Sequence, residues 1–255
     1  MWHEHLRVRA YEAGPDGRVS VLPLLDYCQE AASNHARALG VMRFDLDAGP
    51  GHWVLRRLRL AVDRYPETRE AVTVETWPST ENGLRVDRDF VITDGDGASI
   101  ARVSSTWYIL DLVRRRPVRI PEWAQVVRLP ERPRALPPSS SEPRPPDRPD
   151  HRRHFHVRRT DLDLAGHANN ARYVEWAVET LPDALFDACE LATVDILFRG
   201  EANRGDVVVC EASAEQEGVY AHRLGDDADG RTLAVLRTTW RPNASSGAAR
   251  TPRRS

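Results

Sequence analysis

Two stretches of the chain carry apolar residues at three- and four-residue steps, which is the spacing of one face of an α-helix. The first stretch, residues 24–39, is followed by Gly40, a residue that commonly ends helices. The second stretch, residues 173–181, is closed by Pro182. Both are rich in alanine, and small side chains let a helix lie close against a sheet. The pattern therefore predicts two long helices, each packed on a sheet.

Segments that follow the two predicted helices repeat each other. When Trp107 is aligned with Trp240, DGDGASIARVSSTW matches DADGRTLAVLRTTW, and the Asp and Gly residues predict the same tight hairpin in each half. Upstream, REAVTVETW aligns with RGDVVVCEA, and each carries alternating valines that indicate a half-buried strand: Val72 and Val74, then Val207 and Val209. The pattern predicts a strand, one helix and about four antiparallel strands, twice, which is an α+β fold.

A proline-rich segment separates the two halves. Nine of the 18 prolines lie between positions 121 and 149. Proline has no backbone N–H and a fixed φ, so this segment is expected to be an extended, solvated linker whose arginines keep it soluble. The predicted organisation is a first unit at 1–120, a linker at 121–150, a second unit at 151–240 and a disordered tail at 241–255.

Composition narrows the functional classes. The formal charge of −2, from 36 basic and 38 acidic residues, provides no global field that would gather nucleic acid. No apolar run approaches the roughly 18 residues needed to cross a bilayer, so no membrane span is expected. The 3 cysteines stand far apart, which favours neither disulfides nor a thiolate metal site and points to the cytoplasm. The polar N-terminus, MWHEHLRVRA, does not read as a secretory signal.

Polar residues crowd together just before the second predicted helix. Within ten positions the chain places Asp161, Asp163, His167, Asn169 and Asn170. Free N–H groups at a helix N-terminus stabilise negative charge that develops on an oxygen, so these side chains could converge on a reacting group. Asp and Asn also serve as simple helix caps, but one cap explains one residue and not five.

The same stretch resembles the C-terminal hot-dog domain of acyl-acyl-carrier-protein thioesterases, whose motif reads approximately Asp-x-Asn-x-His-x-Asn-Asn-x-x-Tyr-x-x-Trp. At the named positions this chain has, in order, Asp163, Ala165, His167, Asn169, Asn170, Tyr173 and Trp176. VLPLLDYCQEAASNHARALGV, WVLRRLRLAVDRYP and STWYILDLVRRRPVRIP resemble the N-terminal half of that family, so the resemblance covers about residues 5–240. It implies a tandem double hot-dog, in which each half wraps an antiparallel sheet around a long central helix.

The resemblance also implies an activity: hydrolysis of the thioester of a fatty acyl group on acyl carrier protein, which releases free fatty acid. It places the catalytic groups at Asp163, His167 and Glu201, with Asn169 and Asn170 positioning the substrate. Ala165 departs from the family, which has its catalytic asparagine there, and Ala202 stands where many plant members carry a cysteine. No cofactor and no metal are expected. The expected partners are an acidic acyl carrier protein and the fatty acyl thioester, with a homodimer as one option.

Several roles stay open at this stage. Glu201 is the preferred general base, His167 could polarise the carbonyl or relay a proton to the leaving thiolate, and Asp163 could fix the imidazole or act on water. The same fold would also support hydrolysis of acyl-CoA, a dehydratase activity, or a non-catalytic acyl-binding module. The basic run at 114–116 could steer an acidic carrier protein, or it could be a solvated strand end.

The first half supplies an internal control. When Tyr27 is aligned with Tyr173, the positions of Asp163 and His167 fall on Gly17 and Val21, and Glu201 falls on Pro66. No second acid–base set is therefore expected, and the first half is expected to shape the acyl pocket. The candidate pocket walls are the apolar helix face at 24–39 and the loop at 41–52.

Overall fold

The computed structural model describes residues 1–41, 52–111, 113–114, 116–120, 129–139 and 141–243. The described strands and helices of the first half are β1 (Trp2–Arg7), α1 (Val21–Ala38), β2 (His52–Val62), β3 (Ala71–Glu81), β4 (Arg85–Asp94), β5 (Ser99–Asp111) and β6 (Arg116–Val118). Those of the second half are β7 (His151–His156), α2 (Asn170–Glu179), α3 (Asp183–Ala188), β8 (Cys189–Phe198), β9 (Val207–Gln216), β10 (Val219–Asp226) and β11 (Thr232–Pro242). Apart from the short β6 and α3, each half is thus a strand, a helix and four antiparallel strands, as the repeat predicts.

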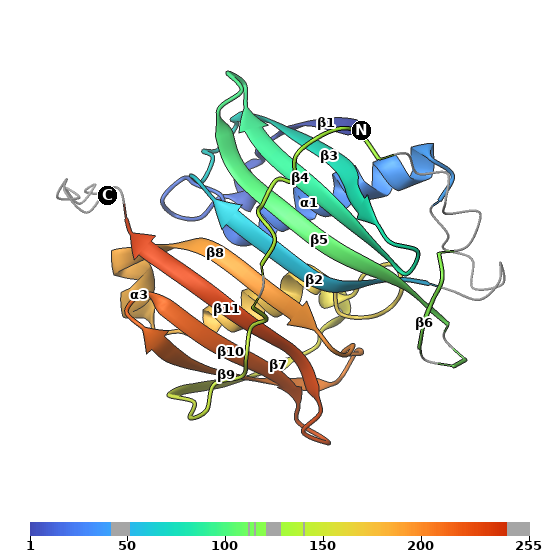
Figure 1. Cartoon of the computed structure of the whole chain (residues 1–255). Coiled ribbons are helices and arrows are strands. Elements are labelled where there is room, and N and C mark those ends of the chain that lie inside the picture. The colour runs from blue at the N-terminus through green and yellow to red at the C-terminus, as the bar shows by residue number, and fades with distance from the viewer. Residues whose placement is uncertain (42–51, 112, 115, 121–128, 140, 244–255) are drawn as a thin grey trace.

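All the described strands belong to one antiparallel sheet, ordered β1-β3-β4-β5-β2-β8-β11-β10-β9-β7, with β6 paired to β5. The two halves join where β2 pairs with β8, from Arg57 opposite Leu197 to Ala61 opposite Thr193. The helices α1 and α2 lie on the same side of this sheet (Figure 1). Because both halves share the sheet, the end of each helix near the joint faces the other half.

Helix α1 ends as the sequence predicts. Gly40 adopts φ +69°, and the N–H groups of Gly40 and Val41 donate to the carbonyls of Arg37 and Ala36, each at 3.0 Å. A residue with a side chain is strained in this left-handed conformation, so glycine stops the helix here.

The register of β9 differs from the predicted alternation. Val72 and Val74 point into the core of the first half, but their counterparts in the second half are Val208 and Cys210, not Val207 and Val209. Val209 is buried as well, because this strand is covered on both faces. Val208, Val209 and Cys210 are buried one after another, and such a run conceals its period, so alternation alone could not fix the register.

The proline-rich linker is not simply solvated, and the interpretation of its arginines was wrong in two cases. The described linker crosses the face of the sheet opposite the helices (Figure 1). Arg134 forms ion pairs with Asp87 at 2.9 Å and Asp89 at 3.2 Å, two carboxylates that are only 1% and 0% exposed. Arg132 stacks over the ring of Trp77, with its guanidinium carbon 4.2 Å from the centroid. Buried carboxylates require counter-charges, and the linker provides one.

Further contacts hold the linker to the joint between the halves. Arg59 donates to the carbonyl of Pro137 at 2.5 Å, and Arg57 donates to the carbonyl of Ser141 at 2.5 Å while it also pairs with Asp195 of β8. β11 continues to Pro242, two residues into the segment expected to be a tail. The domain boundaries stay a prediction, since the two halves share one sheet and the linker contacts both of them.

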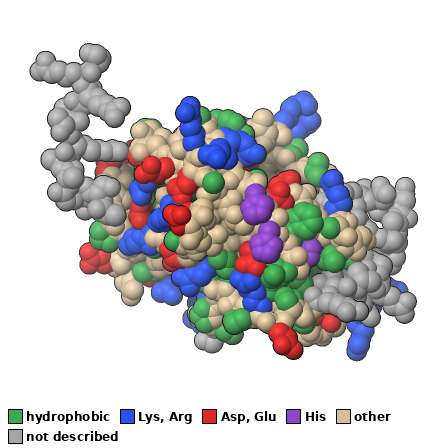
Figure 2. All heavy atoms as spheres, turned by 90° about the horizontal axis from the view of Figure 1, so that it is seen from above, with side chains coloured by type: hydrophobic (Ala, Val, Ile, Leu, Met, Phe, Trp, Pro, Cys, Tyr) green, Lys and Arg blue, Asp and Glu red, His purple; other side chains and the backbone are tan. Residues whose placement is uncertain are grey.

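Charges are mixed over the surface. On the face shown in Figure 2, arginine and acidic side chains are interspersed and a few histidines gather together. None of the helices in the described part of the chain has both the length and the apolar character needed to span a bilayer.

A buried histidine makes stability depend on pH. His222 is 0% exposed, and burial lowers its pKa to about 3. The group is neutral in the folded protein but titrates near its ordinary pKa when unfolded. Its contribution to the free energy of unfolding is therefore complete above pH ~6.5. That contribution is lost as the pH falls toward 3, because the unfolded chain then takes up a proton that the folded protein does not. We expect the unfolding free energy to fall by on the order of 1–2 kcal/mol between pH ~7 and ~5 from this residue.

Chemical denaturation of the wild type and His222→Leu at both pH values measures this effect. The variant should be less sensitive to pH than the wild type, even if it is less stable throughout. His35, whose pKa burial lowers to about 4, supplies a second and similar contribution that remains in both proteins. Equal pH sensitivity in the two proteins would contradict the assignment.

Candidate active site

A tight turn between a short 3-10 helix and α2 carries the polar cluster. The carboxylate of Asp163 accepts hydrogen bonds from the backbone N–H groups of Ala165 at 2.8 Å and His167 at 3.3 Å. The N–H of Asp163 donates to the carbonyl of His167 at 2.8 Å, and Gly166 takes φ +83° inside the turn. Asp163 thus orders the backbone that presents His167, and in the described turn its carboxylate bonds to backbone N–H groups and not to the imidazole.

The structure brings His167 and Glu201 together from distant parts of the sequence. The imidazole Nε2 lies 3.5 Å from a carboxylate oxygen of Glu201, and the two side chains are 38% and 56% exposed. Their loops are fixed by backbone pairing: His167 bridges to Asn203, and the N–H of Ala168 donates to the carbonyl of Ala202 at 2.9 Å. The acid–base pair is open to solvent but stands on a rigid support.

Tyr173 connects this pair to α2, a role that the sequence did not reveal. Its hydroxyl accepts a hydrogen bond from the N–H of Ala202 at 2.9 Å, next to Glu201. Burial raises the pKa of Tyr173 to about 12, the carboxylates of Glu201 and Asp163 add to the rise, and Arg231 opposes it. The hydroxyl is therefore a neutral anchor surrounded by the charged groups of the site. Only the tyrosine in the family motif could have hinted at this.

The two asparagines differ in position. Asn169 is the N-cap of α2: its side-chain oxygen accepts from the N–H of Ala171 at 2.9 Å and from Gln29 of α1 at 3.1 Å. Asn170 is the first residue of the helix and lines a cavity. The simple cap interpretation therefore holds for Asn169, which also ties the two halves together.

Asp161 lies near the cluster in sequence but apart from its chemistry. Its side chain is 1% exposed and pairs with Arg158 at 2.8 Å and Arg172 at 3.9 Å. Burial alone would raise the pKa of Asp161, but the bonds from Arg158 hold it below its ordinary value. This residue stabilises the base of the turn.

A cavity of about 120 Å³ lies where the two halves meet, between α1, α2 and the sheet. Its apolar walls include Leu25, Cys28, Phe90, Trp107, Val174 and Phe198. On α1, Leu25 and Cys28 of the expected pocket wall line this cavity, whereas residues 42–51 of the predicted loop wall lie outside the described residues. Asn170 and Gln29 make the cavity polar at the N-terminus of α2.

Backbone bridges show which residues of the first half occupy the equivalent positions. Ala13 bridges to Val19 as Leu162 does to Ala168, and Arg18 bridges to Glu67 as His167 does to Asn203. The counterparts of Asp163, His167 and Glu201 are therefore Gly14, Arg18 and Tyr65. The predicted alignment on Gly17, Val21 and Pro66 was wrong because Leu24, and not Tyr27, takes the place of Tyr173.

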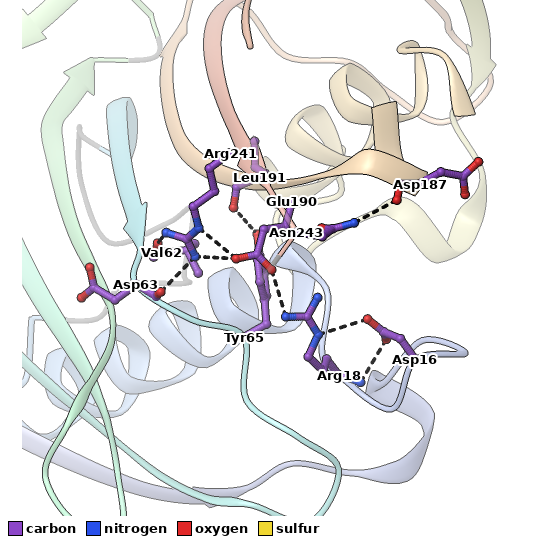
Figure 3. Close-up of polar contacts among 10 residues, drawn as sticks. All are labelled: Asp16, Arg18, Val62, Asp63, Tyr65, Asp187, Glu190, Leu191, Arg241 and Asn243. Carbon is purple, nitrogen blue, oxygen red and sulfur yellow. Dashed lines mark hydrogen bonds and ion pairs between the residues drawn. The ribbon is translucent and has the colours of Figure 1, made fainter. Parts of the chain in front are cut away.

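The counterpart site holds an ion-pair cluster instead of an acid–base pair (Figure 3). Glu190, at the start of β8, pairs with Arg18 at 2.9 Å and with Arg241 at 2.7 Å. The hydroxyl of Tyr65 donates to the carbonyl of Leu191 at 2.9 Å. Residues of both halves close this position, so the described part of the first half has no second acid–base pair there.

Comparison with known proteins agrees with this geometry. The model of the acyl-ACP thioesterase N-terminal domain matches residues 1–125, and the model of the C-terminal domain matches residues 145–242. The chain belongs to the acyl-ACP thioesterase family. A palmitoyl-acyl carrier protein thioesterase of Gossypium hirsutum is 28% identical over 98% of this chain, and a dodecanoyl-[acyl-carrier-protein] hydrolase of Cinnamomum camphora is 28% identical over 92%. The chain spans 66% of the length of each of these chloroplastic relatives.

Solved structures of the family confirm the fold. A 12:0-ACP thioesterase from Umbellularia californica superposes with a TM-score of 0.84 at 27% identity, over 94% of this chain and 97% of that one. An acyl-ACP thioesterase from Bacteroides thetaiotaomicron gives 0.83 over 94% and 97%, at an identity of 21% that supports the fold alone. The predicted tandem double hot-dog of the α+β class is thereby confirmed.

Proposed function

We propose that this chain hydrolyses the thioester between a fatty acyl group and acyl carrier protein, and that Asp163, His167 and Glu201 carry the reaction. Family membership supports the proposal. The single observation that carries it is the His167–Glu201 pair. Each of the two residues lies on a loop that adjoins an element lining the apolar cavity. Asn170, in the cavity wall, is three residues beyond His167, and Phe198 is three residues before Glu201.

In the proposed mechanism the acyl chain occupies the cavity, and the thioester lies at the N-terminus of α2. Glu201 removes a proton from water, and the water oxygen attacks the carbonyl carbon. The helix N-terminus stabilises the oxyanion. The C–S bond then breaks, and His167 relays the proton that Glu201 took from water to the leaving thiolate, which returns both side chains to their starting state. Asp163 holds the turn that aims the imidazole. No group of three or more metal-binding side chains occurs among the described residues.

Asn170 is the amide best placed to orient the thioester, since Ala165 supplies only a methyl group and Asn169 is engaged as a cap. We expect Asn170→Ala to lower kcat/KM on fatty acyl-ACP about tenfold without loss of stability. The matched variant Asn169→Ala should instead lower the unfolding free energy by about 1 kcal/mol. Parallel kinetics and denaturation distinguish them, and the reverse outcome would exchange the two roles.

Thiol release tests the activity directly. The purified chain is incubated with fatty acyl-ACP and acyl-CoA of matched chain length, and free thiol is followed with a chromogenic disulfide. Faster release from the carrier protein supports the proposal, and equal or faster release from CoA favours the acyl-CoA hydrolase. Binding without release identifies a non-catalytic module. Alkene formation from a hydroxyacyl substrate without thiol release identifies a dehydratase.

We also propose that the chain works in the cytoplasm. All three cysteines are free thiols in the structure, as suits a reducing compartment: Cys28, Cys189 and Cys210. The homodimer stays a prediction.

A further inference from the structure

An exposed apolar side chain marks the turn of the candidate active site. Leu164 lies between Asp163 and Ala165 and is 87% exposed, although the turn itself is fixed by the hydrogen bonds of Asp163. A leucine held in water on a rigid turn gains nothing for the fold. It lies on the turn that carries His167, three residues before that imidazole.

Three exposed arginines lie on the segments that carry the reacting pair. Arg159, Arg199 and Arg204 are exposed, and none forms an ion pair with the described residues. Arg159 leads into the catalytic turn, and Arg199 precedes Glu201 by two residues. Arg204 lies in the turn whose Asn203 bridges to His167, and the next residue, Gly205, donates to the carbonyl of Val157 at 3.0 Å. The three charges therefore belong to loops that are joined to one another around the site.

The first half shows that the fold does not demand these residues. The same backbone bridges assign the counterparts of Arg159, Leu164, Arg199 and Arg204 as Ala10, Pro15, Asp63 and Thr68. None of these is cationic, and one is acidic. This cationic and apolar set of residues thus occurs only in the half that holds the acid–base pair.

We propose that Arg159, Leu164, Arg199 and Arg204 form the docking surface for acyl carrier protein. This inference rests on the proposed function. Acyl carrier protein is acidic, so unpaired arginines attract it, and the exposed Leu164 provides an apolar contact on the same loops. The other candidate, the basic run at 114–116, is less suited, because the N–H of Arg114 donates to Asp111 at 2.9 Å and its guanidinium lies 4.0 Å from the same carboxylate. Arg115 lies outside the described residues.

Kinetics with two substrates tests the docking surface. The triple variant Arg159→Gln, Arg199→Gln, Arg204→Gln is compared with the wild type on a fatty acyl-ACP and on the N-acetylcysteamine thioester of the same fatty acid. At ~20 mM salt we expect the KM for acyl-ACP to rise at least tenfold, and by ~200 mM salt the difference should shrink because surface charges are screened. Kinetics on the carrier-free thioester should change by less than about twofold, since these residues act on the carrier.

Two further variants sharpen the result. Leu164→Ala should raise the KM for acyl-ACP at both salt concentrations, because an apolar contact is not screened. Arg116→Gln removes an exposed charge from the basic run at 114–116, and this variant should leave the KM for acyl-ACP unchanged. An unchanged KM in the triple variant, equal losses on both substrates, or a rise in KM with Arg116→Gln would overturn the proposal.

Binding separates failure of docking from failure of catalysis. Fluorescence anisotropy with labelled holo-acyl carrier protein gives the Kd for the wild type and the triple variant. One outcome is that the wild type binds the carrier at least tenfold more tightly than the triple variant does and yet releases no thiol from acyl-ACP. In that case the docking surface is supported and the proposed function is wrong. If the wild type hydrolyses acyl-ACP and both proteins bind the carrier equally, the function stands and the docking surface falls.

Discussion

Glu201→Gln is expected to lower kcat on fatty acyl-ACP on the order of 10²-fold or more while the thermal unfolding midpoint stays unchanged. Glutamine keeps the size of the side chain but cannot accept a proton from water. Since the carboxylate is 56% exposed and, among the described residues, forms an ion pair only with His167 at 3.5 Å, its loss leaves no buried group without a partner. His167→Ala should lower kcat to a similar extent, because the leaving thiolate then lacks its proton donor.

Steady-state thiol release and a melting curve on each variant measure these effects. Glu179→Gln, an exposed carboxylate at the other end of α2, is the control and should retain full activity. If the Glu201→Gln and His167→Ala variants turn over at the wild-type rate, the pair is a surface ion pair and the reacting groups lie elsewhere. If activity falls only together with the melting temperature, the residues support the fold and not the reaction.

Local patterns in the sequence were sufficient for much of the fold. Apolar spacing located α1 and α2, Gly40 located the end of α1, and the repeated Asp-Gly segments located the last hairpin of each half. These features depend on neighbouring residues alone. The family motif, and not the local pattern, brought His167 and Glu201 to one site, since they are separated by an entire helix and strand.

What could not be predicted depends on contacts between segments far apart in the chain. The hydroxyl of Tyr173 is held by the backbone N–H of Ala202, and the side chain of Asn169 accepts a hydrogen bond from Gln29 of the other half. The register of the first half against the second was set by backbone bridges and not by the two tyrosines that seemed to match. The linker arginines were taken as solvated because nothing local to them indicates the carboxylates they meet.

The turn that carries His167 and the equivalent turn that carries Arg18 have the same backbone pairing but different functions. In the second half the position of His167 is open and faces Glu201. In the first half the same position is Arg18, and Glu190 binds it together with Arg241 at the boundary of the halves (Figure 3). The side chain at this position therefore decides whether the turn serves chemistry or holds the halves together, while the backbone pairing stays the same.

Arg134→Met is expected to lower the unfolding free energy by about 3–5 kcal/mol, the largest stability effect of any single change considered. Asp87 and Asp89 are almost fully buried on β4, and Arg134 contacts both. Thr106 also donates to Asp87 at 2.8 Å and the N–H of Ala135 donates to Asp89 at 3.2 Å, but neither brings a charge. Arg85 lies 3.3 Å from Asp87 and compensates one carboxylate in part. Methionine preserves the length of the side chain and removes the cation that contacts both carboxylates, so Asp89 keeps only the longer-range attraction of Arg59.

Urea denaturation at neutral pH measures the loss, and the linker itself provides the control. Arg148→Met removes an exposed linker arginine and should change the unfolding free energy by less than about 0.5 kcal/mol. Adding Asp89→Asn to Arg134→Met should recover part of the loss, because an uncharged amide is less costly to bury than an unpaired carboxylate. If the linker only joined the two halves, Arg134→Met and Arg148→Met would have equal, small effects, and Asp89→Asn would recover nothing. A flexible connector contributes through its length, and not through a charge that it brings to β4.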